Sequence, residues 1–289
     1  MRLVRWNLSS RARELSGGDA IVVSIPKSGR TWLRTFLCSY FCGKIGRPFT
    51  LDPDRSAQIP RLIYTHDLFE QRTKTDFWDK LRGKYLIPPN ERSRTPIMLL
   101  ARDPRDAFVS LQVQLTRRTR ETPDELKAKS ASELLRDPAF GIESIVAVMN
   151  AWLREWSGRD NFLLVRYEDL QAAPRENFSR VVRFLGEKSI DEKAFGQALE
   201  FSDFGNMQKL ESAGAFDSKI LRAGDARDPE SFKVRRGKIG GFADYLSPND
   251  QQFAAAAMTK LDPRFGYPPN ESSASDKKER HPEHDINRE

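Results

Sequence analysis

The stretch AIVVSIPKSGRTWLRTFLCSYF, at residues 20–41, constrains the fold of this chain more than any other part of the sequence. It begins with apolar, mostly β-branched residues up to Ile25, which is typical of a strand buried on both faces. From Thr31 onward, apolar residues recur at helical spacing, and Gly43 is placed to end the helix. A buried strand, a tight loop and a helix predict an α/β fold with an anion site at the loop. The free N–H groups and the positive dipole end of such a helix face the loop.

The loop between the strand and the helix carries a cation and hydroxyl donors that suit an anionic ligand. Lys27 supplies a mobile positive charge, and Ser28 and Thr31 supply hydroxyl groups. The Walker A pattern G-x-x-x-x-G-K-[ST] is absent, because Lys27 precedes Gly29 instead of following it. An ATP-dependent kinase of a small molecule would need that pattern and an acid that holds magnesium, so the residue order argues against this alternative.

The segment PKSGRTWL, at residues 26–33, resembles the 5′-phosphosulfate-binding loop of sulfotransferases that use 3′-phosphoadenosine 5′-phosphosulfate (PAPS). That family reads P-K-S-G-T-T-W, so Arg30 is the one departure. The resemblance implies that the cofactor's phosphosulfate is bound by Lys27, Ser28, Gly29, Arg30, Thr31 and Trp32. It also implies that Lys27 stabilises negative charge on the leaving oxygen, and that Ser28 holds Lys27 back until an acceptor arrives.

A second strand, loop and helix are predicted at residues 96–111. The apolar run PIMLLA is followed by the polar segment RDPRD, and apolar residues then resume at Ala107. In the family, an Arg at the strand end and a Ser one helical stretch later bind the 3′-phosphate, and Arg102 and Ser110 match that spacing. A guanidinium fork suits a phosphate dianion better than a point charge does. Taken alone, RDPRD also fits a turn with local salt bridges.

A candidate general base follows the short strand predicted at residues 61–65. His66 is the only histidine inside the expected domain, because the other two lie in the polar C-terminal segment. By itself, a histidine at a strand end also fits a structural hydrogen-bonding role. The family carries Lys-Thr-His here, with the His as general base. Thr65 and His66 match, but Tyr64 takes the lysine's position, so that contribution is absent or comes from another residue.

Two segments resemble the parts of the family that enclose the adenine. The predicted strand at residues 161–167 leads into Glu168-Asp169, which matches a Tyr-Glu-Asp segment whose Tyr lies near the adenine, here Tyr167. The segment SDFGNM, at residues 202–207, is similar to Ser/Thr-x-Phe-x-x-Met. It implies that Ser202 and Phe204 help to enclose the ring, which packs well on an aromatic face.

A last segment, RRGKIGGF at residues 235–242, resembles R-K-G-x-x-G-D-W, a loop that closes over the 3′-phosphate. The resemblance implies cofactor binding by Arg235, Arg236 and Gly237. Gly241 and Phe242 replace the family's Asp-Trp pair. Read without its context, the segment also fits an exposed basic turn.

Composition and charge leave other function classes open. The net charge of +7 fits an anionic ligand, nucleic acid or an acidic membrane surface. A non-catalytic nucleotide- or nucleic-acid-binding protein is therefore the second alternative. The basic stretch at residues 116–138 lacks interleaved aromatic residues that would stack on bases, so we interpret it as a solvated or mobile segment over the active site.

The two cysteines and the absence of apolar segments indicate the compartment. Cys38 and Cys42 have no neighbouring His and are predicted to be buried free thiols, without a disulfide framework. The N-terminal region lacks the apolar core of a signal peptide, and no run approaches membrane-spanning length. We expect a cytoplasmic protein.

Together, the matching segments follow the family's order from residue 20 to residue 242. They predict a single α/β domain with a central parallel β-sheet flanked by helices, the P-loop-NTPase-like sulfotransferase fold. We expect an N-terminal extension at residues 1–19, the domain at residues 20–268, and a disordered polar tail at residues 269–289, its polar composition starting at Tyr267.

The expected function is transfer of a sulfuryl group from PAPS, the co-substrate, to a hydroxyl of a small-molecule, sugar or lipid acceptor. The resemblance implies that no metal is needed. We expect no nucleic-acid partner and a monomer or homodimer. The acceptor pocket is expected from the divergent regions at residues 46–60, 69–89 and 115–141.

Overall fold

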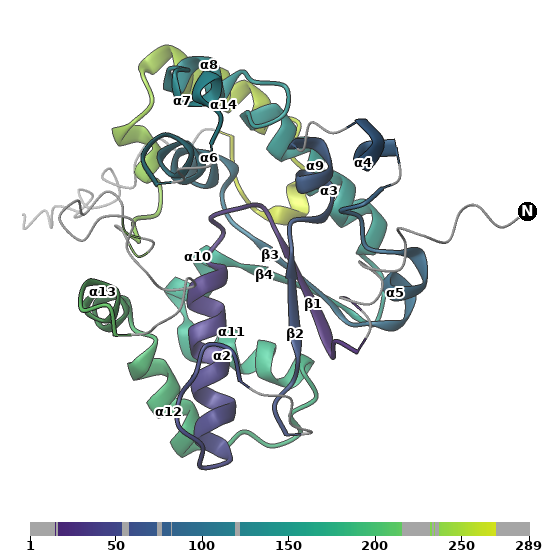
Figure 1. The fold of residues 1–289 in the computed structure, drawn as a ribbon, viewed down its shortest axis with the longest axis vertical. Coiled ribbons are helices and arrows are strands. Elements are labelled where there is room, and N and C mark those ends of the chain that lie inside the picture. The colour runs from purple at the N-terminus through teal and green to yellow at the C-terminus, as the bar shows by residue number, and fades with distance from the viewer. Residues whose placement is uncertain are drawn as a thin grey trace, which may run out of the picture.

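The computed structural model describes residues 15, 17–53, 58–73, 77–81, 83–118, 122–215, 232, 234 and 237–269. Within them, four parallel strands form one sheet in the order β2–β1–β3–β4 (Figure 1). The strands are β1 (Ala20–Ser24), β2 (Leu62–Thr65), β3 (Ile97–Ala101) and β4 (Phe162–Arg166). In the register, Val22 of β1 lies between Tyr64 of β2 and Met98 of β3. The expected central parallel sheet is confirmed.

Helices cover both faces of the sheet (Figure 1). One face is covered by α2 (Arg30–Lys44), α11 (Pro174–Phe184) and α12 (Glu192–Phe201), and the other by α6 (Pro104–Val113), α9 (Ile142–Trp156) and α14 (Pro248–Met258). The remaining described helices are α3 (Asp67–Thr73), α4 (Phe77–Leu81), α5 (Pro89–Arg94), η1 (Gln114–Arg118), α7 (Asp124–Lys127), α8 (Ala131–Leu135), α10 (Tyr167–Ala172), α13 (Phe204–Ser212), η3 (Gly241–Asp244) and η4 (Pro263–Phe265).

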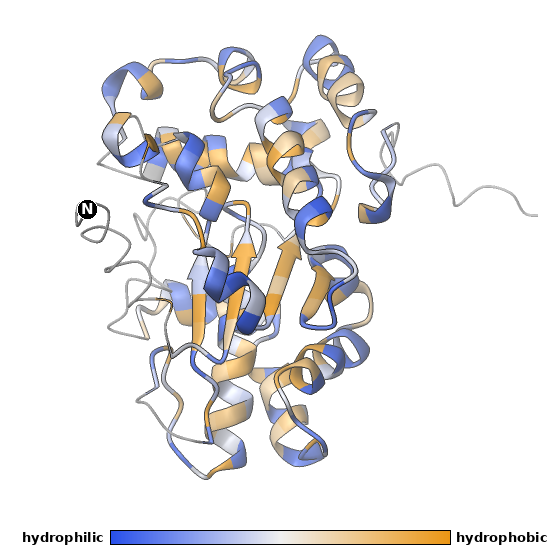
Figure 2. Ribbon diagram, turned by 90° about the vertical axis from the view of Figure 1, so that its right-hand side faces the viewer, coloured by the Kyte–Doolittle hydropathy of each residue, from blue (hydrophilic) through white to orange (hydrophobic). Residues whose placement is uncertain are grey.

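The two faces bury alternate residues of the same strands, because successive side chains of a strand point to opposite sides. Val22, Met98 and Leu100 pack with α2, α11 and α12. Val23 and Leu99 pack with α6, α9 and α14. Figure 2 shows the resulting hydrophobic strands between helices with one polar side. Burial on both faces explains why β1 and β3 are unbroken apolar runs in the sequence.

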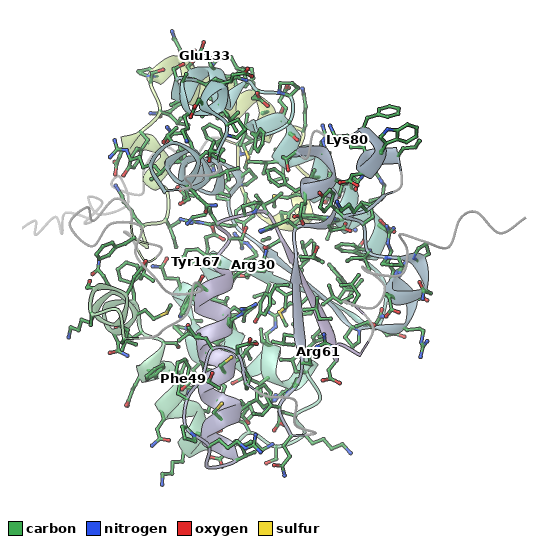
Figure 3. The ribbon with its side chains drawn as sticks, viewed as in Figure 1. Arg30, Phe49, Arg61, Lys80, Glu133 and Tyr167 are labelled. Carbon is green, nitrogen blue, oxygen red and sulfur yellow. The ribbon has the colours of Figure 1, made fainter. Side chains whose placement is uncertain are left out.

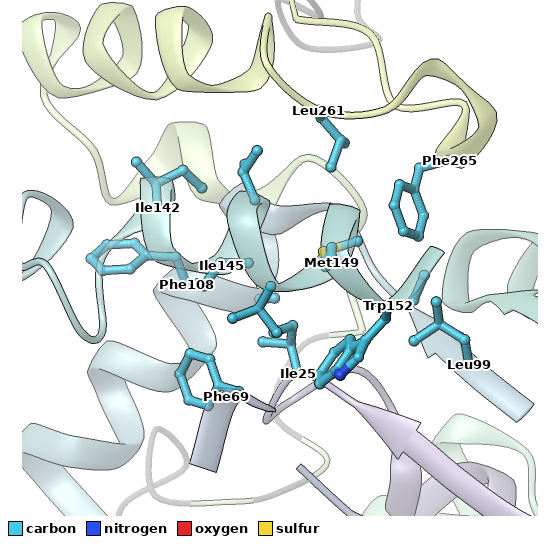
Figure 4. Packing of buried hydrophobic residues seen from close by; sticks show 14 of the residues in the cluster. Ile25, Phe69, Leu99, Phe108, Ile142, Ile145, Met149, Trp152, Leu261 and Phe265 are labelled. Carbon is cyan, nitrogen blue, oxygen red and sulfur yellow. The ribbon is translucent and has the colours of Figure 1, made fainter. Parts of the chain in front are cut away.

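Helix α9 lies at the centre of the larger core (Figure 4). Its apolar stripe is buried along its whole length, at Ile142, Ile145, Val146, Met149, Trp152, Leu153 and Trp156. The indole N–H of Trp152 donates a hydrogen bond of 2.9 Å to Asp67 Oδ2, which ties α9 to α3. This stripe therefore forms part of the core.

The loops that follow the strands lie at one edge of the sheet. Because the strands are parallel, the carboxyl ends of β1, β3 and β4 lie together, and α2, α6 and α10 begin there. Ligands of open α/β sheets bind at this edge. Cys38 and Cys42 lie farther along α2 as buried free thiols, as expected.

The less regular segments differ in their burial. The strand predicted at residues 161–167 is the edge strand β4, and Val165 is its one buried residue. The expectation that the basic stretch at residues 116–138 is solvated or mobile is wrong for α8, whose Leu134 and Leu135 are buried in the core. The region at residues 46–60 buries Leu51 and Ile59.

Residues near both ends of the described part of the chain pack against the domain. Tyr267 is 8% exposed and donates a hydrogen bond of 2.7 Å to Glu168 Oε2. Arg105 donates hydrogen bonds of 3.1 Å to the carbonyls of Pro268 and Pro269. Leu15, placed in the N-terminal extension, packs into the larger core. In the described part of the chain, no helix has the length and apolar character needed to cross a membrane.

The docking of Tyr267 predicts a graded loss of stability. Tyr267→Phe should lower the free energy of unfolding by about 1–3 kcal/mol, because the half-buried Glu168 carboxylate loses a donor. Tyr267→Ala should lower it by about 3–5 kcal/mol, because the ring also leaves the core. Urea denaturation followed by tryptophan fluorescence measures both values. Wild-type stability in Tyr267→Ala would show that this segment does not dock.

Candidate functional site

A cavity of about 870 Å³ opens at the carboxyl edge of the sheet. Segments that are far apart in the sequence line it, from the loop after β1 to the loop before η3. Of the site residues expected from the sequence, the lining includes Lys27, Gly29, Arg30, Thr31, Trp32, His66, Arg102, Ser110, Tyr167, Ser202, Phe204 and Gly237. Ser28 is buried and does not line the cavity. Arg235 and Arg236 lie outside the described residues.

The loop after β1 has an unusual backbone. Lys27 has a φ of 72°, a left-handed conformation that costs a non-glycine residue about 1–2 kcal/mol. Gly29, the N-cap of α2, has a φ of 96°. A Cβ on Gly29 would lie 2.7 Å from Tyr167 Cδ2, so this position requires glycine for both its backbone and its packing. Strained backbone of this kind is concentrated at functional sites.

Arg102 joins the two loops that the sequence predicts to bind phosphate. Its Nη1 donates hydrogen bonds to the Lys27 carbonyl, at 3.0 Å, and to Ser110 Oγ, at 3.4 Å. Its Cζ lies 4.6 Å from the centroid of the Tyr167 ring. The Nε atom is buried and has no hydrogen-bond partner among the residues that the structure describes. A buried donor without a partner is costly, so an anion bound here would supply what the protein lacks.

His66 lies at the end of β2 and is held from two sides. Its Nδ1 donates a hydrogen bond of 2.7 Å to the Ser24 carbonyl, which places a ring proton on Nδ1. Arg30 Nη1 lies 2.7 Å from Nε2 and 3.1 Å from Nδ1. In Figure 3, Arg30 and Tyr167 lie at the N-terminal end of α2, at the centre of the molecule. These contacts fix the imidazole ring at the cavity.

Aromatic side chains form another part of the cavity wall. The Trp32 and Tyr167 rings pack edge to face, with centroids 5.6 Å apart. Gly237 has a φ of 60°, and a Cβ on it would lie 2.6 Å from Phe204 Cε2. Its carbonyl accepts a hydrogen bond of 2.7 Å from Gln171 Nε2. These contacts hold the loop at residue 237 against α10 and α13, where a flat ring would find aromatic neighbours.

Ser202 has a more limited role than its hydroxyl group suggests. Its Oγ donates a hydrogen bond of 2.7 Å to the Ala198 carbonyl. The hydroxyl proton is therefore used inside α12, and Ser202 offers the cavity an acceptor oxygen only.

Asp106 fixes the loop before η3. Its carboxylate accepts hydrogen bonds from the backbone N–H groups of Gly240, at 2.8 Å, and Phe242, at 2.9 Å. Burial raises the pKa of this carboxyl group, and the Arg102 charge opposes the rise. Nearby, the Arg105 Nη2 and Asp103 Oδ2 atoms form a buried ion pair of 2.6 Å. Both interpretations of RDPRD therefore hold, because Arg102 lines the cavity while Asp103 and Arg105 pair locally.

Several lining residues were not predicted from the sequence. Arg34 lies one helical turn after Arg30, a spacing that would have indicated it. Gln171, Lys238 and Tyr245 also line the cavity. Gln171 and Tyr245 lie outside the matched segments, and Lys238 falls at an unspecified position of R-K-G-x-x-G-D-W, so the resemblance marks none of them.

The family model described as a sulfotransferase domain matches residues 18–262. The chain is 26% identical over 225 residues to human sulfotransferase 2B1, covering 70% of this chain and 55% of that protein. It therefore spans little more than half of the length of that relative. It is 26% identical over 260 residues to the guinea pig (Cavia porcellus) 3-alpha-hydroxysteroid sulfotransferase, covering 87% and 85%. Cytosolic sulfotransferase 14 of Arabidopsis thaliana is 25% identical over 266 residues, covering 83% and 74%.

Solved structures share the fold at lower identity. Mouse sulfotransferase SULT7A1, complexed with PAP, superimposes with a TM-score of 0.54 at 18% identity, covering 88% of this chain and 89% of the mouse chain. Retinol dehydratase, in complex with androsterone and the inactive cofactor PAP, gives a TM-score of 0.55 at 17% identity, covering 83% and 79%. The likeness extends through the whole sheet and its flanking helices.

The packing of Gly237 against Phe204 predicts unequal effects of two glycine substitutions. Gly237→Ala and Gly240→Ala both place a side chain on left-handed backbone, at a cost of about 1–2 kcal/mol. A Cβ on Gly240 would have no atom of the described residues within 4 Å, so Gly240→Ala serves as the matched control. Gly237→Ala should cost about 1–3 kcal/mol more, because Phe204 must move. Equal free energies of unfolding in chemical denaturation would contradict the contact.

Proposed function

This chain belongs to the sulfotransferase domain family, and from that membership we propose that it transfers a sulfuryl group from PAPS to an acceptor hydroxyl. The family match covers residues 18–262, which include every cavity-lining residue. It lends no support to the kinase or the nucleic-acid binder. The relatives named as cytosolic sulfotransferases support a cytoplasmic location.

One observation carries the proposal. Arg102 contacts both the Lys27 carbonyl and Ser110, so the two predicted phosphate sites form one continuous site. A nucleotide with phosphate groups at both its 3′ and 5′ positions needs such a site. The buried Arg102 Nε, which has no partner in the described part of the chain, fits a 3′-phosphate oxygen. PAP, the nucleotide bound in the mouse sulfotransferase and retinol dehydratase structures, carries both groups.

Three groups of residues would each bind one part of the nucleotide. Residues 27–32 would hold the 5′-phosphosulfate at the start of α2, where the helix dipole favours an anion. Arg102 and Ser110 would hold the 3′-phosphate, and Arg235 and Arg236 are proposed to join them. Trp32, Tyr167, Ser202, Phe204 and Gly237 would enclose the adenine.

The chemistry follows from His66 and Lys27. Bound PAPS supplies a sulfuryl group whose leaving group is a phosphate oxygen. His66 would accept the acceptor's hydroxyl proton at Nε2, while the acceptor oxygen bonds to sulfur and the bond from sulfur to the bridging oxygen breaks. Lys27 would stabilise the negative charge that remains on the bridging oxygen. The products are a sulfate monoester and adenosine 3′,5′-bisphosphate.

The 3′-phosphate site predicts nucleotide selectivity. Wild type should bind adenosine 3′,5′-bisphosphate more tightly than adenosine 5′-monophosphate. Arg102→Ala should weaken the bisphosphate by about 10- to 150-fold, the equivalent of one charge-assisted bond, and leave the monophosphate nearly unchanged. Calorimetric titration of both nucleotides measures this, with Arg102→Lys as a variant that keeps the charge and loses the fork. Equal affinity of wild type for the two nucleotides would remove PAPS from the proposal.

The two proposed catalytic groups predict a separation of turnover from binding. His66→Ala should lower kcat by about 10²–10⁴-fold, because the general base is lost. Lys27→Met should also lower kcat far more than it weakens the bisphosphate, because its charge acts on the transition state. Labelled PAPS and an acceptor trapped from a hydroxyl-compound library give the rates. Near-wild-type turnover in His66→Ala would remove His66 from the mechanism. Equal losses of kcat and affinity in Lys27→Met would make Lys27 a binding residue only.

A further inference from the structure

The resemblance leaves one positive charge unaccounted for, because Tyr64 stands where the family's Lys-Thr-His segment has a lysine. A phenol cannot carry a positive charge. Burial raises the pKa of Tyr64 to about 12, so the side chain is neutral at ordinary pH. A cation that serves this part of the site must come from another element.

Two guanidinium groups of α2 lie over the Tyr64 ring. The distance from the ring centroid is 5.4 Å to Arg30 Cζ and 4.1 Å to Arg34 Cζ. The two arginines are one turn apart and share a face of the helix. Arg30 also contacts His66, because its Nη1 lies 2.7 Å from Nε2 of the imidazole. Arg30 therefore brings a positive charge to both Tyr64 and the proposed base.

Arg30 does not approach Nε2 along its lone pair. A nitrogen on the line of the Nε2 lone pair would lie much farther from Nδ1 than from Nε2. Arg30 Nη1 is 2.7 Å from Nε2 and 3.1 Å from Nδ1, so it lies beside the ring. The contact with Arg30 is therefore compatible with proton transfer to Nε2.

The stability of α2 does not explain an arginine at this position. Arg30 is the first residue of α2, and the first turn contains no acidic residue. The positive end of the helix dipole disfavours a cation there by roughly 0.3–1 kcal/mol. Threonine, the family residue, avoids this cost. The helix dipole therefore disfavours arginine at position 30, which suggests that Arg30 is there for its interactions at the site.

We infer that Arg30 supplies, from α2, the positive charge that the family pattern places at position 64, and that it faces the sulfuryl group during transfer. This inference rests on the proposed function. The sulfuryl group would move from the oxygen held by Lys27 to the oxygen held by His66. Arg30 follows Lys27 by three residues, at the start of α2, and it contacts His66. Its guanidinium therefore lies beside that route, where it stabilises negative sulfuryl oxygens.

Restoring the family pattern tests this inference. Arg30→Thr should lower kcat by about 10²–10³-fold, as loss of one transition-state donor does. Its affinity for adenosine 3′,5′-bisphosphate, which lacks the sulfuryl group, should fall by less than about fivefold. Adding Tyr64→Lys to Arg30→Thr should restore at least about a tenfold part of the lost kcat. Arg34→Thr, the same substitution one turn later, is the matched control, and Tyr64→Lys should not restore what it loses.

The outcomes separate clearly. A double variant that is no faster than Arg30→Thr, with both unfolding at the same temperature, would overturn the inference. So would an Arg30→Thr variant that keeps the wild-type kcat. A wild type that does not prefer the bisphosphate over the monophosphate would instead overturn the proposed function.

A second measurement does not depend on turnover. The sequence has three histidines, and nitrogen-15 labelling of histidine allows His66 to be assigned by its loss in His66→Ala. In the ligand-free full chain, Arg30→Thr should shift the ring-nitrogen resonances of His66, and Arg34→Thr should shift them much less. Unchanged His66 resonances in Arg30→Thr would overturn the inference whatever the turnover shows.

Discussion

The hydrogen bond from Arg102 to the Lys27 carbonyl is the interaction on which the rest of the site depends. The parallel register sets Ser24 of β1 beside Leu100 of β3, so the loops after these two strands begin side by side. A guanidinium in such a place must be paired, because burying a charge without partners is costly. Arg102 meets this demand only in part, since its Nε has no partner within the described ranges. The site is therefore arranged for an anion that completes the pairing.

Two carboxylates, one buried and one half-buried, hold the walls of the site in place without competing for the anion. Asp106 directs its oxygens to two backbone N–H groups before and within η3. Glu168 accepts hydrogen bonds from the Asp103 N–H and the Tyr267 hydroxyl. Burial raises the pKa of both carboxyl groups. Because their lone pairs are occupied by protein donors, these acids stabilise loops beside an anion site with little repulsion of the ligand.

Arg30 and Tyr64 illustrate how far a motif comparison reaches. The motif comparison showed that position 64 lacks the family's positive charge, but it did not show which other residue supplies that charge. The two positions are 34 residues apart in the sequence, on different elements, and nothing local couples them. The fold brings Arg30 to within 5.4 Å of the Tyr64 ring centroid and into contact with His66. These two departures from the family pattern, Arg30 and Tyr64, therefore lie close together in the molecule.

The sequence by itself determined the elements whose signals are local. The apolar runs predicted β1 and β3, the helical spacing of apolar residues from Thr31 onward predicted α2, and the loop at residues 26–30 predicted where α2 starts, because these patterns repeat within a few residues. It did not reveal α8, whose buried pair of leucines is too short to show a period, or the packing of Tyr267, which stands at the start of the polar C-terminal segment. Only the tertiary structure decided that Arg102 completes the first loop, that Arg30 contacts His66, and that Asp106 fixes Gly240, a residue 134 positions away. Such contacts depend on how separate elements pack, and the spacing of residues along the chain carries no record of that packing.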